Sequence, residues 1–66
     1  MTDDQRYLKA LEVATMVLED EQEARAWMEE SSASLGGARP IDLVQTDEGL
    51  RLVLYELEQM DFGHPV

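Results

Sequence analysis

Cysteine is absent from this chain, and histidine occurs only once, at His64. The lack of cysteine excludes disulfide bonds, and nothing in the composition indicates an oxidising compartment. A single histidine near the last residue argues against a zinc site built by the protein. No apolar run reaches the length of a membrane span, and Met1–Asp4 lacks the basic and apolar regions of a signal peptide. We therefore expect no metal, no membrane partner and a cytoplasmic location.

The residue patterns of common enzyme sites are also missing. The serines between positions 31 and 34 have no histidine nearby in the sequence, and His64 would be poorly held as a general base. Gly36 and Gly37 lack the spacing of a phosphate-binding loop and are not followed by Lys-Ser or Lys-Thr. The acidic residues at 3–4 and 19–23 do not follow the spacing of a calcium loop, and helix capping explains them. We therefore predict no enzyme and no cofactor, but a binding module.

Basic residues are few: the 66-residue chain has 5 Lys and Arg against 15 Asp and Glu, a formal net charge of −10. This balance opposes direct nucleic-acid binding, which relies on clustered Lys and Arg, and it favours approach to a basic protein surface. A domain this short buries only about 60% of the surface that its unfolded chain exposes, so its core is marginal. We expect a second subunit, as in a homo-oligomer, or a larger partner to add stability.

The first predicted helix runs from about Asp3 to Leu18, behind a capping box formed by Thr2 and Gln5. Its spacing gives a main apolar stripe of Tyr7, Leu8, Leu11, Ala14 and Leu18. A second stripe consists of Ala10, Val13, Met16 and Val17. Because an amphipathic helix needs only one buried face, this helix is either central in the domain or packs on another chain.

A second helix is predicted to begin after Asp20, which reads as its N-cap, and to run to about Glu30. It carries Ala24, Met28 and the only tryptophan, Trp27. This side chain either fills the core or anchors an interface, and we favour the core.

The last helix is predicted to begin after Thr46 and to run to about Asp61, where Gly63 can end it. Its strong apolar stripe consists of Leu50, Val53, Leu54, Leu57 and Met60. Leu52 and Tyr55 lie off that stripe and suggest a second contact surface.

The stretch from Leu35 to Gly49 is the part that differs most from a generic helix. Adjacent glycines allow a positive φ or a close approach to another surface, and Pro40 suits the first turn of a helix. Three serines just before this stretch favour a loop. We therefore predict an all-α fold in a single domain, residues 1–66: a small bundle of three main helices plus one short helical turn after the Gly-Gly loop.

The order of certain residues resembles a known family. That order is Ala24, Trp27, Leu35-Gly36-Gly37-x-x-Pro40-x-x-Leu43, Thr46-x-x-Gly49, Val53, Leu57 and Gly63. It resembles the toxin-binding domain of the MbcA/ParS/Xre antitoxins, over about Val17 to Gly63. The resemblance implies a module that binds a RES-domain toxin, which degrades NAD, and blocks its active site. The DNA-binding helix-turn-helix region of full-length members is not expected here, because only the first predicted helix precedes the similar region.

The resemblance also marks candidate partner-binding residues. The shaped loop comprises Leu35, Gly36, Gly37, Arg39, Pro40 and Ile41. The residues implied to occlude the toxin are Phe62, Gly63, His64, Pro65 and Val66. Arg39 either meets a carboxylate of the partner or pairs within the chain with Asp42 or Glu48, and we favour the internal pair. Phe62 equally suits a place beneath the last helix, closing the core.

Three hypotheses compete at this point. The leading one is an antitoxin module that neutralises a RES-type toxin. The second is an acidic mimic of nucleic acid that inhibits a DNA-binding protein, motivated by the net charge of −10. The third is a non-inhibitory oligomerisation module, motivated by the second apolar stripes.

Overall fold

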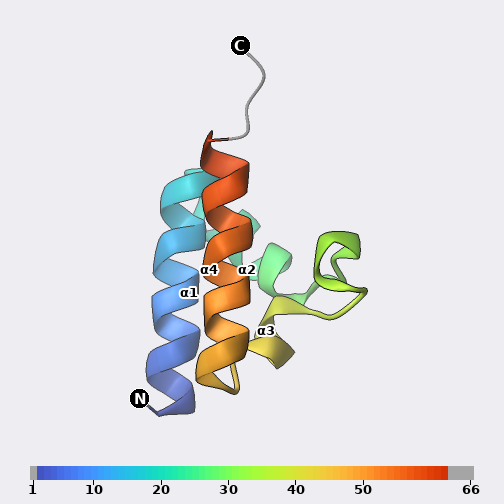
Figure 1. Ribbon diagram of the computed structural model, residues 1–66. Coiled ribbons are helices and arrows are strands. Elements are labelled where there is room, and N and C mark those ends of the chain that lie inside the picture. Colours follow the sequence, from blue (N-terminus) through green and yellow to red (C-terminus); the bar gives the residue numbers. More distant parts are fainter. Residues whose placement is uncertain (1, 63–66) are drawn as a thin grey trace.

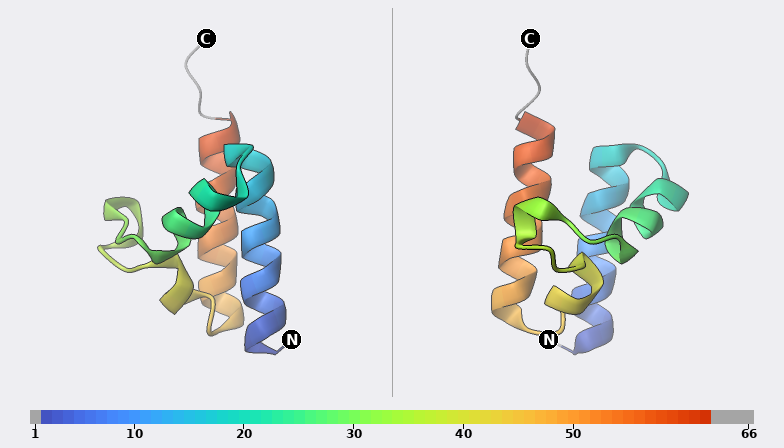
Figure 2. Two further views of the ribbon diagram at one scale, coloured as in Figure 1. Left: turned by 180° about the vertical axis from the view of Figure 1, so that it is seen from behind. Right: turned by 90° about the vertical axis from the view of Figure 1, so that its right-hand side faces the viewer.

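Two helices of 16 residues each form the frame of the molecule, and the computed structural model describes residues 2–62. Helix α1 (Asp3–Leu18) and helix α4 (Asp47–Phe62) lie side by side and run in the same direction, so both C-termini lie at one end (Figure 1). The chain between them lies on one side of the pair (Figure 2). It contains α2 (Glu21–Glu29), the 3-10 turn η1 (Ala33–Leu35) and the short α3 (Pro40–Leu43). The predicted all-α bundle with one short helical turn is confirmed.

The helix starts follow from local capping. The Thr2 hydroxyl accepts a hydrogen bond from the Gln5 backbone N–H, and the Gln5 side chain accepts one from the Thr2 N–H, which completes the predicted capping box. The Asp20 carboxylate accepts from the N–H groups of Gln22 and Glu23. Between these helices Glu19 takes a left-handed conformation with φ 60°, which turns the chain sharply from α1 into α2.

The core lies where α1, α2 and α4 meet. Its buried apolar residues are Ala10, Leu11, Ala14, Ala24, Met28, Val44, Leu50, Val53 and Leu57. Helix α1 contacts both α2 and α4, so the central position that its two apolar stripes allowed is the one found. Trp27 is partly buried and packs against this core, as we favoured.

The buried face of α1 differs from the predicted stripe. Leu8 was predicted to be buried but is 59% exposed, whereas Ala10, assigned to the second stripe, is fully buried. The reason is that α1 has two neighbours, and the face between them centres on Ala10 and Ala14. At 3.6 residues per turn, Leu8 lies about 120° around the helix from Ala14. Spacing alone predicts an apolar stripe but not which small residues allow close helix approach.

The serine-rich segment is more ordered than predicted. Ala33–Leu35 forms the 3-10 turn η1, where we expected a loop. The Leu35 N–H donates to the Ser32 carbonyl, and the Gly36 N–H donates to the Ala33 carbonyl. None of the helices in the described residues has the length and apolar character of a membrane span.

Gly49 allows the end of α3 to lie directly against the first turn of α4. A Cβ added at this position would lie 1.7 Å from the carbonyl oxygen of Leu43, far inside van der Waals contact. Thr46 caps the same turn, because its hydroxyl accepts a hydrogen bond of 3.0 Å from the Gly49 N–H. The Thr46-x-x-Gly49 spacing is therefore a helix cap combined with a close crossing of two backbones.

Arg6 ties the start of α1 to the connection between α3 and α4. Its Nε donates to the Val44 carbonyl at 2.9 Å, and its Nη2 donates to the Gln45 carbonyl at 2.7 Å. Its Nη1 donates to Asp47 at 3.0 Å, and Asp3 also pairs with the guanidinium. The Arg6 side chain is only 11% exposed, so its charge depends on these partners. One side chain thereby holds the start of α4 beside the start of α1.

Replacing Gly49 by alanine tests the close crossing. Helix propensity alone would stabilise the G49A variant by about 1 kcal/mol. We expect the clash with Leu43 to outweigh this gain and to destabilise the protein by about 1–3 kcal/mol net, as overpacking does. Thermal unfolding followed by circular dichroism measures the difference. A higher Tm for Gly49→Ala than for the wild type would show that the two backbones do not meet as described.

Replacing Arg6 by methionine tests the tie between the two helix starts. The variant keeps an unbranched side chain but leaves the Val44 and Gln45 carbonyls without their charged donor. We expect a loss of about 1.5–3 kcal/mol in the free energy of unfolding by urea, the range of a charged hydrogen bond. Arg51→Met is the matched control, because Arg51 is exposed on α4. Equal stability of the two variants would contradict the role given to Arg6.

Candidate functional site

The predicted loop forms a closed structure that we call the corner segment (residues 35–41). The Ser32 carbonyl accepts hydrogen bonds from the N–H groups of Leu35, at 3.0 Å, and Gly37, at 2.8 Å. The Ser32 N–H in turn donates to the Ala38 carbonyl at 3.0 Å. The turn that precedes Pro40 is therefore held by its own backbone, and it projects to one side of the bundle (Figure 1).

The two adjacent glycines serve this turn through their backbone angles. Gly36 has φ 72° and Gly37 has φ 84°, values that side chains disfavour. An added Cβ would meet nothing within 4 Å at either position. The sequence allowed two reasons for these glycines, a positive φ or a close approach to another surface. The structure shows the positive φ, and no other part of the described chain approaches them closely. Both residues are exposed, so their backbone is open to a partner.

The structure divides the loop residues that the sequence marked as one set. Pro40 is buried, and Leu35 and Ile41 are partly buried and pack against the core. These three residues hold the corner segment in place. Gly36, Gly37 and Arg39 are exposed, so a partner can reach them directly.

Arg39 pairs within the chain, as we favoured. Its Nε donates to Asp42 Oδ2 at 2.9 Å, and its Nη2 donates to Oδ1 at 3.0 Å, so the pair is bidentate. The hydrogen bond from Arg39 lowers the pKa of the Asp42 carboxyl, and the same bond raises the pKa of the guanidinium. Both side chains are about half exposed, so the pair orients Arg39 on an accessible surface.

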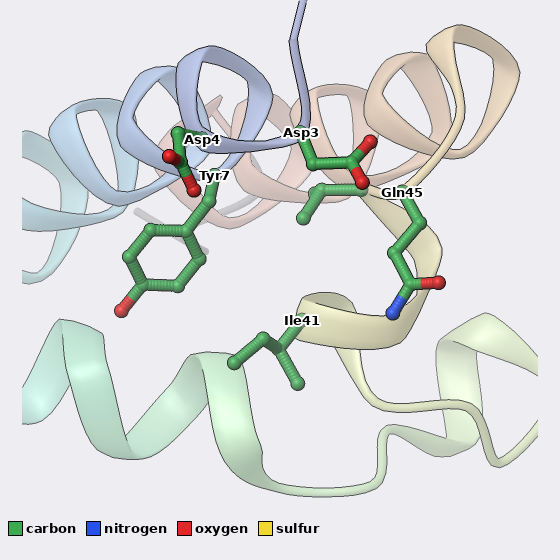
Figure 3. A pocket seen from close by; sticks show the side chains of 6 residues that line it. Asp3, Asp4, Tyr7, Ile41 and Gln45 are labelled. Atoms are coloured by element: carbon green, nitrogen blue, oxygen red, sulfur yellow. The ribbon is translucent and has the colours of Figure 1, made fainter.

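A hollow that the sequence did not predict lies beside the corner segment. It has a volume of about 450 Å³ and is open on one side, between the start of α1 and α3. Tyr7 and Ile41 lie on opposite sides of it, with Asp3, Asp4 and Gln45 at its edge (Figure 3). Asp3 and Asp4 were assigned only to helix capping. No sequence signal could have joined them to Ile41, because the pairing depends on the fold.

The predicted occluding residues fall largely beyond what the structure describes. Phe62 is the last residue of α4, and Gly63, His64, Pro65 and Val66 lie outside the described residues. Their role in blocking a partner stays a prediction. Among the residues that are described, no group of three or more His, Cys, Asp or Glu is placed to hold a metal ion.

Residues 13–63 match the family model of the antitoxin Xre/MbcA/ParS C-terminal toxin-binding domain. The chain belongs to this family. The matched range contains α2, the corner segment and α4, together with α1 from Val13 to its end. No curated protein and no solved structure gives a match.

Membership assigns the broad function of this toxin-binding domain. It is an antitoxin module whose partner is a protein toxin. The corner segment and the Thr46-x-x-Gly49 turn both lie inside the matched range.

The Arg39–Asp42 pair predicts the titration of this surface. Because the pKa of folded Asp42 lies below its ordinary value, the pairing is complete above that value and is lost as pH falls through the lowered one. We expect the NMR titration midpoint of the Asp42 carboxyl carbon to rise in Arg39→Gln, which removes the charged donor. Arg25→Gln, in another exposed ion pair, is the control and should leave it unchanged. An unchanged midpoint in Arg39→Gln would refute the pair in solution.

Proposed function

We propose that this chain neutralises a RES-type, NAD-degrading toxin by binding it and blocking its active site. Family membership over residues 13–63 is the observation that carries the proposal, because it gives a toxin-binding antitoxin domain. The RES class follows from the resemblance of the Leu35-Gly36-Gly37-x-x-Pro40-x-x-Leu43 pattern to antitoxins of that type. The proposal covers residues 1–66 as one domain that acts in the cytoplasm, where NAD is depleted.

The corner segment is the first part of the proposed toxin contact. Gly36 and Gly37 are exposed and carry no side chain, so a toxin surface can approach their backbone closely. The hydrogen bonds from Ser32 fix this backbone before binding, which lowers the entropy that association costs. Arg39 stands beside the glycines with its guanidinium already oriented by Asp42. Leu35, Pro40 and Ile41 support this contact from within the domain.

The end of α4 and the residues after it are the second part of the proposed contact. Phe62 is the last residue of a helix of 16 residues, which is anchored in the core through Val53 and Leu57. Gly63, His64, Pro65 and Val66 follow it in the sequence. A rigid helix can direct the residues after it toward the entrance of an active site. The net charge of −10 adds attraction to a basic surface around that entrance.

Co-expression with the product of the neighbouring gene, which we expect to be a RES-domain toxin, tests the proposal. We expect a stable complex on co-purification and preservation of cellular NAD. Removal of residues 63–66 should leave a measurable complex but lower the inhibition of NAD degradation by about tenfold or more, since occlusion contributes beyond binding. Ala26→Ser, an exposed change on α2, is the matched control for folding and expression. No complex, or NAD loss at the rate of the toxin alone, would reject the proposed function.

A further inference from the structure

A groove between the C-terminal halves of α1 and α4 forms a surface separate from the corner segment. Helix α1 contributes Val13, Met16 and Val17 to its lining, and α4 contributes Glu58 and Asp61. The groove has a volume of about 290 Å³ and is more enclosed than the hollow at the start of α1. No residue of α2, η1 or α3 lines it.

The floor of this groove is apolar and accessible. Val13 and Val17 are partly buried against the core, so they form a fixed base. Met16 is 71% exposed, more than any other large apolar side chain that the structure describes. A methionine side chain is flexible and polarizable, which lets it adapt to an apolar group placed against it. The groove can therefore take one apolar side chain of a partner.

The polar rim of the groove is negative. Among the described residues, the polar side chains that line it are Glu58 and Asp61 of α4, both exposed. The last turns of α1 and α4 contain no basic residue. Lys and Arg on these two helices occur only in their first halves, at Arg6, Lys9 and Arg51.

The direction of the two helices adds to the negative potential at the groove. Because α1 and α4 are parallel, the negative ends of both helix dipoles lie at the same end of the bundle as the groove (Figure 1). Neither dipole end is offset by a positive side chain in its last turn. A group entering the groove from a partner therefore meets an apolar floor and a negative rim together.

We propose that this groove binds a segment of the toxin that places one apolar side chain between α1 and α4 and a Lys or Arg against Glu58 and Asp61. The inference rests on the proposed function and names the chemistry of a third contact with the toxin. A second copy of this chain is disfavoured as the occupant. Each copy carries a net charge of −10, so two such rims would repel each other.

Affinity measurements on the complex with the RES toxin test the groove. Met16→Ser should weaken binding by about tenfold or more, because the variant lacks the apolar side chain that the complex would bury. Leu52→Ser is the matched control, since Leu52 is also an exposed apolar residue but does not line this groove. It should bind as the wild type does.

Charge reversal tests the rim independently of the floor. The double variant Glu58→Lys with Asp61→Lys should weaken binding by about tenfold at low salt and should flatten its salt dependence. The double variant Glu23→Lys with Glu30→Lys makes the same change of charge at two exposed positions along α2, where Glu30 is the C-cap residue, and is the control. Circular dichroism of each free variant confirms the fold before binding is compared.

The outcomes separate the two proposals. If the wild type forms no complex with the RES toxin, the proposed function fails and this inference fails with it. If the wild type binds but the Met16 and Glu58/Asp61 variants bind as tightly as their controls, the groove is not a toxin contact and the proposed function stands. A dimer of the free protein that Met16→Ser dissociates would make a second copy the occupant and overturn the inference.

Discussion

The guanidinium of Arg6 is the interaction on which the arrangement of the helices depends. It is nearly buried, and its partners are the Val44 and Gln45 carbonyls at the end of α3 and Asp47 in the first turn of α4. These partners place the start of α4 beside the start of α1, so the two long helices are parallel. The parallel pair in turn brings both negative helix ends and the α1–α4 groove to the opposite end of the bundle. One nearly buried cation thus helps to determine where the apolar and acidic surfaces lie.

In the corner segment, some residues of the family pattern pack in the core and others are exposed to a partner. Its apolar members face the core, and its glycines face solvent with a backbone that the Ser32 hydrogen bonds hold in place. The glycine of the next pattern, Gly49, has a different reason: it removes a clash between two backbones inside the domain. The glycines of the family pattern are therefore needed for two different reasons. Gly36 and Gly37 have a positive φ, and Gly49 allows two backbones to pack closely.

Helix boundaries were well predicted from the sequence, because capping is local. Thr2, Asp20 and Thr46 each accept the hydrogen bonds expected of an N-cap, and predicted and observed ends differ by a residue or less. Features that depend on distant partners were not predictable. Arg6 contacts carbonyls 38 and 39 residues away. Because every residue has a carbonyl, the sequence does not indicate which ones an arginine will contact. The burial of Ala10 in place of Leu8, and the hollow beside Ile41, depend likewise on which helices become neighbours.

Parallel pairing of α1 with α4 has a consequence for how the protein is made. Helix α1 packs on α2, which follows it directly, but its other neighbour is α4, so the face of α1 toward α4 stays uncovered while the ribosome is still producing the middle of the chain. Formation of contacts this distant must wait until the whole of α4 has emerged. An antitoxin built this way completes its core, and with it the α1–α4 groove, only at a late step of synthesis.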